Sequence, residues 1–392
     1  MKTITNAVLS TRLYVHERDV SFMDNEKPIV DFGAIRDALG KDFEPVQVLD
    51  GQAKVIKPEI VSKYSNEQLV EFFKLMLWER TLHQRSNALT RQGRLGFYAP
   101  TEGQEASEMG SNAAMKKTDV LMPAYRDIPQ LIQHGLPVYK AFLWSRGHVL
   151  GNEYPEDFHA MPPQIIIGAQ YVQAAGVALG IKKNGTEDKV AYTYTGDGGT
   201  SQGDFYEGMN FAGAFEAPAV FIVQNNGYAI SVPRRKQTAA KTLAQKAVAA
   251  GIPSVQVDGM DFLAVYEVTK AAREYAAAGN GPVMIETLTY RFGPHTNAGD
   301  DPKRYRTKDE EQPWFDNDPL IRYRKYLTDQ GVWSEDQENE YVEQVKEDIK
   351  AAVKQADEAP KQKMTEFLGN VFEEQPQNIQ QQITEFQAKE SK

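Results

Sequence analysis

Apolar residues follow a helical period in the first part of the chain and a strand-like pattern from about residue 165. Behind Ser65-Asn66-Glu67-Gln68, apolar side chains recur at helical spacing as far as about Arg91, which predicts a capped helix. A Gly-rich break at residues 92–96 precedes a second helix expected near residues 103–106. Further along, short apolar strands alternate with helical segments. This alternation predicts an α/β fold, with a doubly wound, mostly parallel sheet flanked by helices.

The predicted elements divide the chain into three parts. Residues 1–60 are expected to form an N-terminal arm, residues 61–333 an α/β domain and residues 334–392 a helical C-terminal extension. Strands are predicted at residues 189–195, 218–223, 254–257 and 282–290, and helices within 173–179 and 204–215. Residues 293–313 are predicted to be a long loop with little regular structure, and such loops are typically functional or disordered.

One polar side chain follows each of the four predicted strands: Asp197, Asn226, Asp258 and His295. Ligands of a doubly wound sheet bind where the carboxyl ends of the strands meet. We therefore expect one edge of the sheet to bring these four residues together.

The pattern Gly196-Asp197-Gly198, followed later by Asn225-Asn226, predicts the chemistry of that edge. A carboxylate and an amide are oxygen ligands suited to Mg²⁺, and a diphosphate can complete the metal's shell. Gly198 and Gly199 allow the backbone to approach phosphate oxygens. Each motif alone is more often a structural turn. Their joint occurrence, strand–GDG–helix–strand–NN, favours a metal–diphosphate site.

Composition narrows the class of protein. The 392 residues carry a net charge of −10, which argues against a nucleic-acid partner, and contain no cysteine, which excludes disulfides and zinc–thiolate sites. The N-terminus lacks a signal-peptide core, and no stretch approaches the ~20 apolar residues of a membrane span. These features predict a soluble, cytoplasmic protein without a membrane partner.

The GDG–NN pattern resembles the thiamine diphosphate (ThDP) motif, and the surrounding sequence resembles the E1 α family of 2-oxo acid dehydrogenase complexes, especially its pyruvate dehydrogenase branch in Gram-positive bacteria. The similar segments occur in family order between about residues 65 and 330. They are residues 103–106 (GQEA), 124–127 (AYRD), 166–170, 196–203, 224–231, 257–261 and 290–306. The resemblance implies the ThDP-binding fold.

The resemblance also implies a role for individual residues at the metal and the diphosphate. Asp197, the side chain of Asn226 and the backbone carbonyl of Tyr228 would ligate Mg²⁺. Tyr125 and Arg126 would hold the diphosphate, and arginine suits this task because its guanidinium donates paired, charge-assisted hydrogen bonds. Gly198 and Gly199 would contact the cofactor through their backbone.

Other implied roles concern the aminopyrimidine ring and the substrate. Ile165 and Ile167, which the sequence alone would place in a buried strand, would contact the ring. Phe97 and Tyr98 would shape the 2-oxo acid pocket. His295 would contact the diphosphate and line the route of the lipoyl arm. Thr296 stands where some mammalian relatives carry a phosphorylated serine.

The family resemblance implies two protein partners. ThDP activation needs a carboxylic acid beside the aminopyrimidine, and no motif here supplies it, since Glu102 and Glu105 lie on the diphosphate side. The resemblance places this glutamate on a β subunit of an α2β2 heterotetramer, which passes the acyl unit to the lipoyl group of an E2 acyltransferase. The basic segments at residues 234–236 and 303–306 are either solvated loop charge or a surface that steers an acidic lipoyl domain.

Three alternatives remain open at this point. A branched-chain 2-oxo acid dehydrogenase E1 α subunit would carry nearly the same motifs as a pyruvate enzyme. A non-catalytic scaffold of the same fold is disfavoured by the intact Asp197, Asn226, Arg126 and His295. A magnesium phosphohydrolase is a remote possibility, because no aspartate nucleophile motif supports it.

Overall fold

The computed structural model describes residues 43–186 and 188–391, all of which belong to one compact unit, Gly40–Lys392. The predicted N-terminal arm lies mostly outside the described residues. None of the helices in the described part of the chain has the length and apolar run that a membrane span requires.

The secondary structure follows the predicted alternation. The strands are β1 (Val120–Met122), β2 (Ala191–Gly196), β3 (Ala219–Asn225), β4 (Tyr228–Ala229), β5 (Val232–Pro233), β6 (Ser254–Asp258) and β7 (Val283–Leu288). The α-helices are α2 (Pro58–Val61), α3 (Asn66–Arg91), α4 (Glu105–Ala113), α5 (Ile128–His134), α6 (Val138–Ser145), α7 (Ala169–Lys183), α8 (Gly203–Ala214), α9 (Arg234–Gln237), α10 (Phe262–Tyr275), α11 (Lys308–Asp316), α12 (Pro319–Asp329), α13 (Glu335–Asp357), α14 (Met364–Gly369) and α15 (Gln377–Glu390). Short helical turns are η1 (Val149–Asn152), η2 (Asp197–Ser201), η3 (Ala244–Ala250), η4 (Ala276–Asn280) and η5 (Pro302–Arg304).

Five strands form one parallel sheet in the order β1-β2-β3-β7-β6, which confirms the predicted fold class. Isolated parallel bridges continue the sheet at both edges, Ala124 with Gln164 beside β1 and Val46 with Val257 beside β6. Strands β2 and β3 are neighbours in the inner part of the sheet, so their carboxyl ends lie side by side at one sheet edge.

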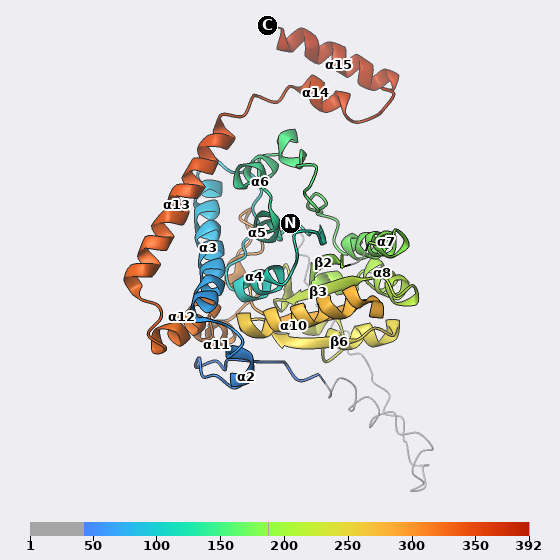
Figure 1. Cartoon of the computed structure of the whole chain (residues 1–392). Helices are drawn as coiled ribbons and strands as arrows, with labels where there is room; N and C mark the ends of the chain where they lie inside the picture. The colour runs from blue at the N-terminus through green and yellow to red at the C-terminus, as the bar shows by residue number, and fades with distance from the viewer. Residues whose placement is uncertain (1–42, 187, 392) are drawn as a thin grey trace, which may run out of the picture. The chain divides into compact units, whose positions relative to one another are not determined.

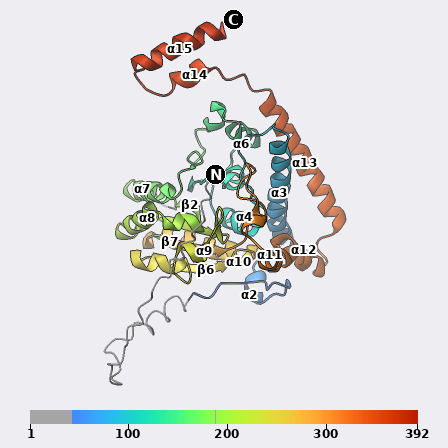
Figure 2. The same cartoon turned by 180° about the vertical axis from the view of Figure 1, so that it is seen from behind.

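Helices cover both faces of this sheet (Figure 1, Figure 2). Helices α7 and α8 pack against each other on one face, and α4 and α10 pack together on the other. Side chains alternate accordingly along each strand: Tyr192 and Tyr194 of β2 join the core beneath α4 and α10, whereas Ala191 joins the core beneath α7 and α8. Both faces are apolar, as expected for strands buried in a parallel sheet.

Two long helices begin with a capping box, of which the one at Ser65 is predicted from the sequence. Ser65 caps α3 with a reciprocal capping box to Gln68, and Ser334 caps α13 in the same way with Gln337. Helix α13 packs against α3 and α6, as both views show (Figures 1 and 2).

The prediction for residues 293–313 is wrong in its second half. Residues 302–304 form η5, and α11 begins at Lys308. The Thr307 side chain accepts a hydrogen bond from the backbone N–H of Glu310, and three acidic residues follow in the first turn, so the start of α11 is capped and matched to the helix dipole.

Close packing of α7 on α8 depends on one glycine. A Cβ atom at Gly208 would lie 2.5 Å from the backbone carbon of Tyr171. We expect Gly208→Ala to lower the free energy of unfolding by about 1–3 kcal/mol because the helices must separate. At Gly180 of α7 a Cβ meets nothing within 4 Å, so Gly180→Ala should instead stabilise the chain by about 0.5–1 kcal/mol. Denaturant unfolding measures both, and equal effects would contradict this account.

Candidate active site

A cavity of about 360 Å³ lies at the carboxyl ends of β2 and β3. The structure brings all ten residues expected at the cofactor to its wall. They are Tyr125, Arg126, Ile165, Ile167, Asp197, Gly198, Gly199, Asn226, Tyr228 and His295.

Strand pairing explains why Asp197 and Asn226 meet. Gly196 of β2 pairs in parallel with Gln224 of β3, so the next residues of both strands leave the sheet at the same edge. Asp197 is buried, and one carboxylate oxygen, Oδ2, accepts a hydrogen bond of 2.7 Å from Gln237 Nε2. Burial raises the pKa of Asp197 to about 6, against the opposing effect of the Gln237 hydrogen bond. A desolvated carboxylate of this kind gains from a bound cation.

The amide of Asn226 is held on its nitrogen side. Asn226 Nδ2 donates to Gln104 Oε1 at 2.8 Å, while Oδ1 accepts a long bond of 3.3 Å from the backbone N–H of Tyr228. Gly227 between them has φ +85°, which few side chains tolerate. Tyr228 is fixed from outside the cavity, because its hydroxyl donates to Glu310 of α11.

Gly198 and Gly199 are required by packing within the protein. A Cβ at Gly198 would lie 2.6 Å from Cβ of Ala229, and one at Gly199 would lie 1.9 Å from Oγ1 of Thr195. The η2 turn therefore packs closely on Ala229 and Thr195, and a larger residue at Gly198 or Gly199 would displace it.

Arg126 and His295 form a second polar part of the cavity wall. Arg126 Nη2 lies 3.2 Å from His295 Nδ1 and donates to the His295 carbonyl oxygen at 3.3 Å. Because a guanidinium can only donate, Nδ1 is the acceptor and the neutral ring carries its proton on Nε2. The Tyr125 ring meets the His295 ring edge-on, with centroids 6.0 Å apart. Asp300 accepts from the His295 backbone N–H at 2.5 Å, which fixes the loop.

This wall is cationic without His295 being charged. Burial lowers the pKa of His295 to about 4, and the nearby guanidinium groups of Arg126 and Arg291 add to the shift. Burial, together with Arg126 and Arg306, also lowers the pKa of Arg291 to about 10, so Arg291 remains charged at neutral pH. The site thus combines fixed positive charge with a neutral imidazole, which suits a polyanionic ligand.

Residues 165–167 differ from the prediction made from the sequence alone. They form no buried strand: the chain turns into α7 here, and Ile165 is 64% exposed. The bridge between Ala124 and Gln164 places this turn beside Tyr125 at the cavity. Ile230, another apolar wall residue, has φ +57°, an unusual conformation for a β-branched residue.

Phe97 and Tyr98 are not brought to the cavity wall. The Phe97 ring meets the Tyr125 ring edge-on, with centroids 6.0 Å apart, so Phe97 contacts a wall residue but does not line the cavity itself. Tyr98 is buried in the core that α13 forms with α6 and the end of α3.

Two further expectations are wrong. Asp258 does not join the other strand-end residues, because its carboxylate accepts from Arg322 and Gln47 at 2.8 Å in a separate cavity. Arg306 is neither a solvated loop charge nor a steering charge: it is buried, and its guanidinium lies 4.8 Å and 4.7 Å from the ring centres of Tyr228 and Tyr290. Lys303 and Arg304 of the same segment are exposed.

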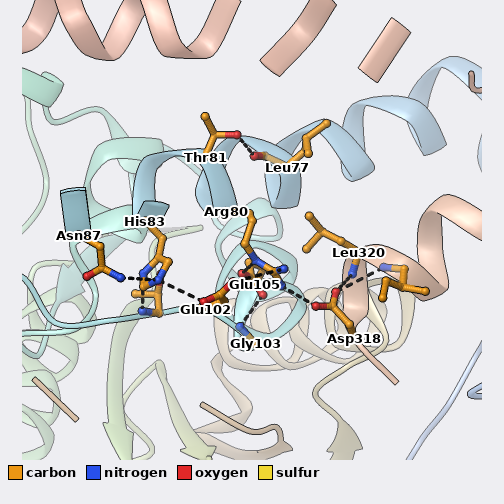
Figure 3. A network of polar contacts seen from close by, with 12 residues as sticks. Leu77, Arg80, Thr81, His83, Asn87, Glu102, Gly103, Glu105, Asp318 and Leu320 are labelled. Atoms are coloured by element: carbon orange, nitrogen blue, oxygen red, sulfur yellow. Dashed lines mark hydrogen bonds and ion pairs between the residues drawn. The ribbon is translucent and has the colours of Figure 1, made fainter. Parts of the chain in front are cut away.

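A buried ionic network supports the loop that leads into α4 (Figure 3). Arg80 of α3 donates to Glu105 of α4 and, at 3.0 Å, to Asp318 at the start of α12. His83, one helical turn further along, approaches Glu102 at 3.5 Å. Glu102 and Glu105 are thus engaged with α3, behind the cavity.

Sequence reasoning missed the two glutamines that hold the candidate ligands. Gln104 belongs to the GQEA segment but has no strand-end position, and Gln237 follows three basic residues that draw attention instead. Hydrogen bonds across long sequence separations reveal both. No pattern in a single sequence points to them.

The oxygen donors fit magnesium bound to a diphosphate. Within residues 43–186 and 188–391, no cluster of three or more His, Cys, Asp or Glu side chains could hold a metal on its own. One carboxylate, one amide and backbone carbonyls leave a bound Mg²⁺ positively charged, so phosphate oxygens would complete its shell. Arg126 adds a second positive group for the same anion.

The depressed pKa of His295 can be tested directly. We expect side-chain NMR to show His295 neutral down to about pH 5, and Arg126→Met to raise its pKa without restoring 6.5, because burial remains the larger cause. The His295 resonance is assigned by its loss in His295→Gln. Arg234→Met is the control and should leave the pKa of His295 unchanged. The folded state then binds fewer protons than the unfolded one between about pH 4 and 6.5, so stability should fall as pH drops through that window. A pKa near 6.5 in the wild type would contradict the account.

Known proteins are similar over most of the chain. A family model described as Dehydrogenase E1 component matches residues 73–365. The pyruvate dehydrogenase E1 component subunit alpha of Staphylococcus aureus (strain Mu50 / ATCC 700699) is 59% identical over 350 residues, which cover 89% of this chain and 94% of that protein. The protein of the same name from Staphylococcus epidermidis (strain ATCC 12228 / FDA PCI 1200) is 60% identical over the same shares. The chain belongs to the dehydrogenase E1 component family.

Proposed function

We propose that the chain is the α subunit of the E1 component of a pyruvate dehydrogenase complex and provides the magnesium–diphosphate half of a ThDP site. The observation that carries this proposal is that Asp197 and Asn226 line one cavity together with Arg126 and His295. Family membership supports it, because E1 dehydrogenases generally use ThDP and Mg²⁺.

Each wall residue has a proposed task. Asp197, the Asn226 amide oxygen and the Tyr228 carbonyl would ligate Mg²⁺, while Tyr125, Arg126 and the backbone of Gly198 and Gly199 hold the diphosphate. Ile165 and Ile167 would contact the aminopyrimidine ring. His295, the proposed catalytic residue, keeps a proton on Nε2 and so can donate to a phosphate or substrate oxygen while adding no charge.

Bound ThDP supplies the electron sink for decarboxylation of a 2-oxo acid. The chain's own residues contribute binding and orientation. The cationic wall would attract the diphosphate, and Ile165, Ile167 and Ile230 add apolar surface to the cavity wall.

The cavity lacks a free acid for cofactor activation. Among the described residues, the carboxylates on its wall are Asp127 and Asp197. Asp127 is buried and already accepts from the Ala124 backbone N–H at 2.6 Å and from Gln130 at 3.2 Å. We therefore propose that a glutamate of a β subunit completes the site in an α2β2 heterotetramer, and that the acyl group passes to the lipoyl group of E2.

Dependence on the β subunit is the first test. The purified chain should be inactive with pyruvate, ThDP and Mg²⁺, and activity should appear when the β subunit is added, as followed by CO₂ release. Decarboxylation by the isolated chain at the rate of the pair would refute the proposed division of the site.

The metal site provides a second test. Asp197→Ala should abolish Mg²⁺-dependent ThDP binding to the reconstituted pair in calorimetry, because the carboxylate ligand is gone. Asp204→Ala, just beyond η2 and outside the cavity wall, is the matched control and should bind normally. Retained Mg²⁺-dependent binding in Asp197→Ala would contradict the proposed metal ligand, whereas a wild-type pair that binds no ThDP would favour a scaffold without cofactor. Comparing turnover of pyruvate with 3-methyl-2-oxobutanoate separates the pyruvate enzyme from its branched-chain alternative.

A further inference from the structure

We propose that Gln104 is a positioning residue that fixes the side-chain amide of Asn226 with its oxygen turned toward the metal. This inference rests on the proposed function. It assigns a task to a residue that contacts neither the cofactor nor the metal.

Gln104 connects the cavity with the interior. Its side chain is fully buried at the residue preceding α4. Gln104 Oε1 accepts from Asn226 Nδ2 at 2.8 Å, and Gln104 Nε2 donates to Glu108 Oε1 at 2.8 Å and to Gln224 Oε1 at 3.3 Å. Glu108 lies one turn further along α4 and is also fully buried.

The chain of hydrogen bonds has one direction. Glu108 Oε1 accepts, so the Gln104 group that faces it must be the NH₂, and the Gln104 oxygen must then face Asn226. Asn226 in turn can offer only its NH₂ to Gln104, and its oxygen is left on the other side. An inverted amide would present N–H groups to a cation and repel it.

A second carboxyl group explains why Glu108 Oε1 stays an acceptor. Glu79 of α3 is buried against Glu108, and among the described residues neither Glu79 oxygen nor Glu108 Oε2 has a hydrogen-bond donor. Two carboxyl groups can contact each other in this way only when they share a proton. Burial accordingly raises the pKa of both groups, with mutual repulsion adding to the shift of Glu108. The shared proton lies on Glu108 Oε2, facing Glu79, because the pKa of Glu108 is the more strongly raised of the two, and Oε1 is therefore free to accept.

The backbone at Gln104 is anchored as well. Gly103, with φ +95°, donates its N–H to Glu105 Oε2 at 2.9 Å, and its carbonyl accepts from Thr289 Oγ1 at 3.0 Å. Glu105 is held by Arg80 in the network of Figure 3. Gln104 is thus fixed at both its backbone and its side chain, as an orienting residue requires.

The test measures Mg²⁺ affinity of the reconstituted α/β pair at saturating ThDP, by calorimetry and by Mn²⁺ electron paramagnetic resonance. Gln104→Leu, which removes the acceptor, should weaken metal binding about tenfold or more. Gln104→Glu keeps an acceptor for Asn226 Nδ2 and, protonated among these buried carboxyl groups, still donates to Glu108, so metal binding should stay close to wild type. Gln256→Leu is the matched control, because Gln256 is a buried glutamine that donates to Glu286 at 3.0 Å in the same sheet.

The inference is overturned if Gln104→Leu binds Mg²⁺ like the wild type. It is also overturned if either Gln104→Glu or the control Gln256→Leu weakens Mg²⁺ binding as much as Gln104→Leu. Should Gln104→Leu not fold, Gln104→Met replaces it: this side chain has no amide oxygen to accept from Asn226, so weaker binding is again expected and unchanged binding refutes the inference. Wild-type binding that Asp197→Ala abolishes and Gln104→Leu preserves refutes this inference alone. A wild-type pair that binds no Mg²⁺–ThDP refutes the proposed function with it.

Discussion

Parallel pairing of β2 with β3 is the constraint on which the site depends. The register that joins Gly196 to Gln224 makes both strands end at the same level of the sheet. Asp197 and Asn226, which are far apart in the sequence, therefore become neighbours without any long-range side-chain contact between them. Every other feature of the site adjusts how these two side chains point and what charge surrounds them.

Buried polar groups behind the site supply that adjustment. Arg80 joins α3, α4 and α12 through ion pairs, and Glu79 and Glu108 share a polar interior with Gln104. A buried ion pair adds little net stability over apolar packing, but removing one partner leaves an uncompensated charge. Such networks therefore favour one arrangement of the groups they hold, and the arrangement here ends at the Asn226 amide.

Charge at the cavity is also set by burial. Arg291 remains ionised, while burial and the nearby guanidinium groups keep the imidazole of His295 neutral. The site therefore attracts a diphosphate and still offers a neutral proton donor. This separation of roles would be lost if His295 were exposed to water.

Much of the fold could be predicted from the sequence because local patterns determine it. The strand ends, the Ser65 cap and the parallel direction of the strands follow from periodicity and capping. The strand ends also point to Asp197, Asn226 and His295. Asp258 was misassigned because its strand lies at the edge of the sheet, beside Arg322.

The remaining features depend on contacts between distant segments. The exposure of Ile165 follows from a bridge between residues 124 and 164, and the burial of Arg306 among tyrosines follows from the path of residues 290–306. Gln104 and Gln237 act through hydrogen bonds that span long stretches of sequence. A single sequence contains no local pattern for such contacts.

The most direct test of the central claim is the position of the metal itself. Crystals of the α/β pair grown with ThDP and Mn²⁺ in place of Mg²⁺ give an anomalous signal that locates the ion without assumptions about the protein. The account predicts one peak per α chain at the carboxyl ends of β2 and β3, between Asp197 and Asn226. A peak elsewhere, or none at this edge of the sheet while ThDP is bound, would contradict it.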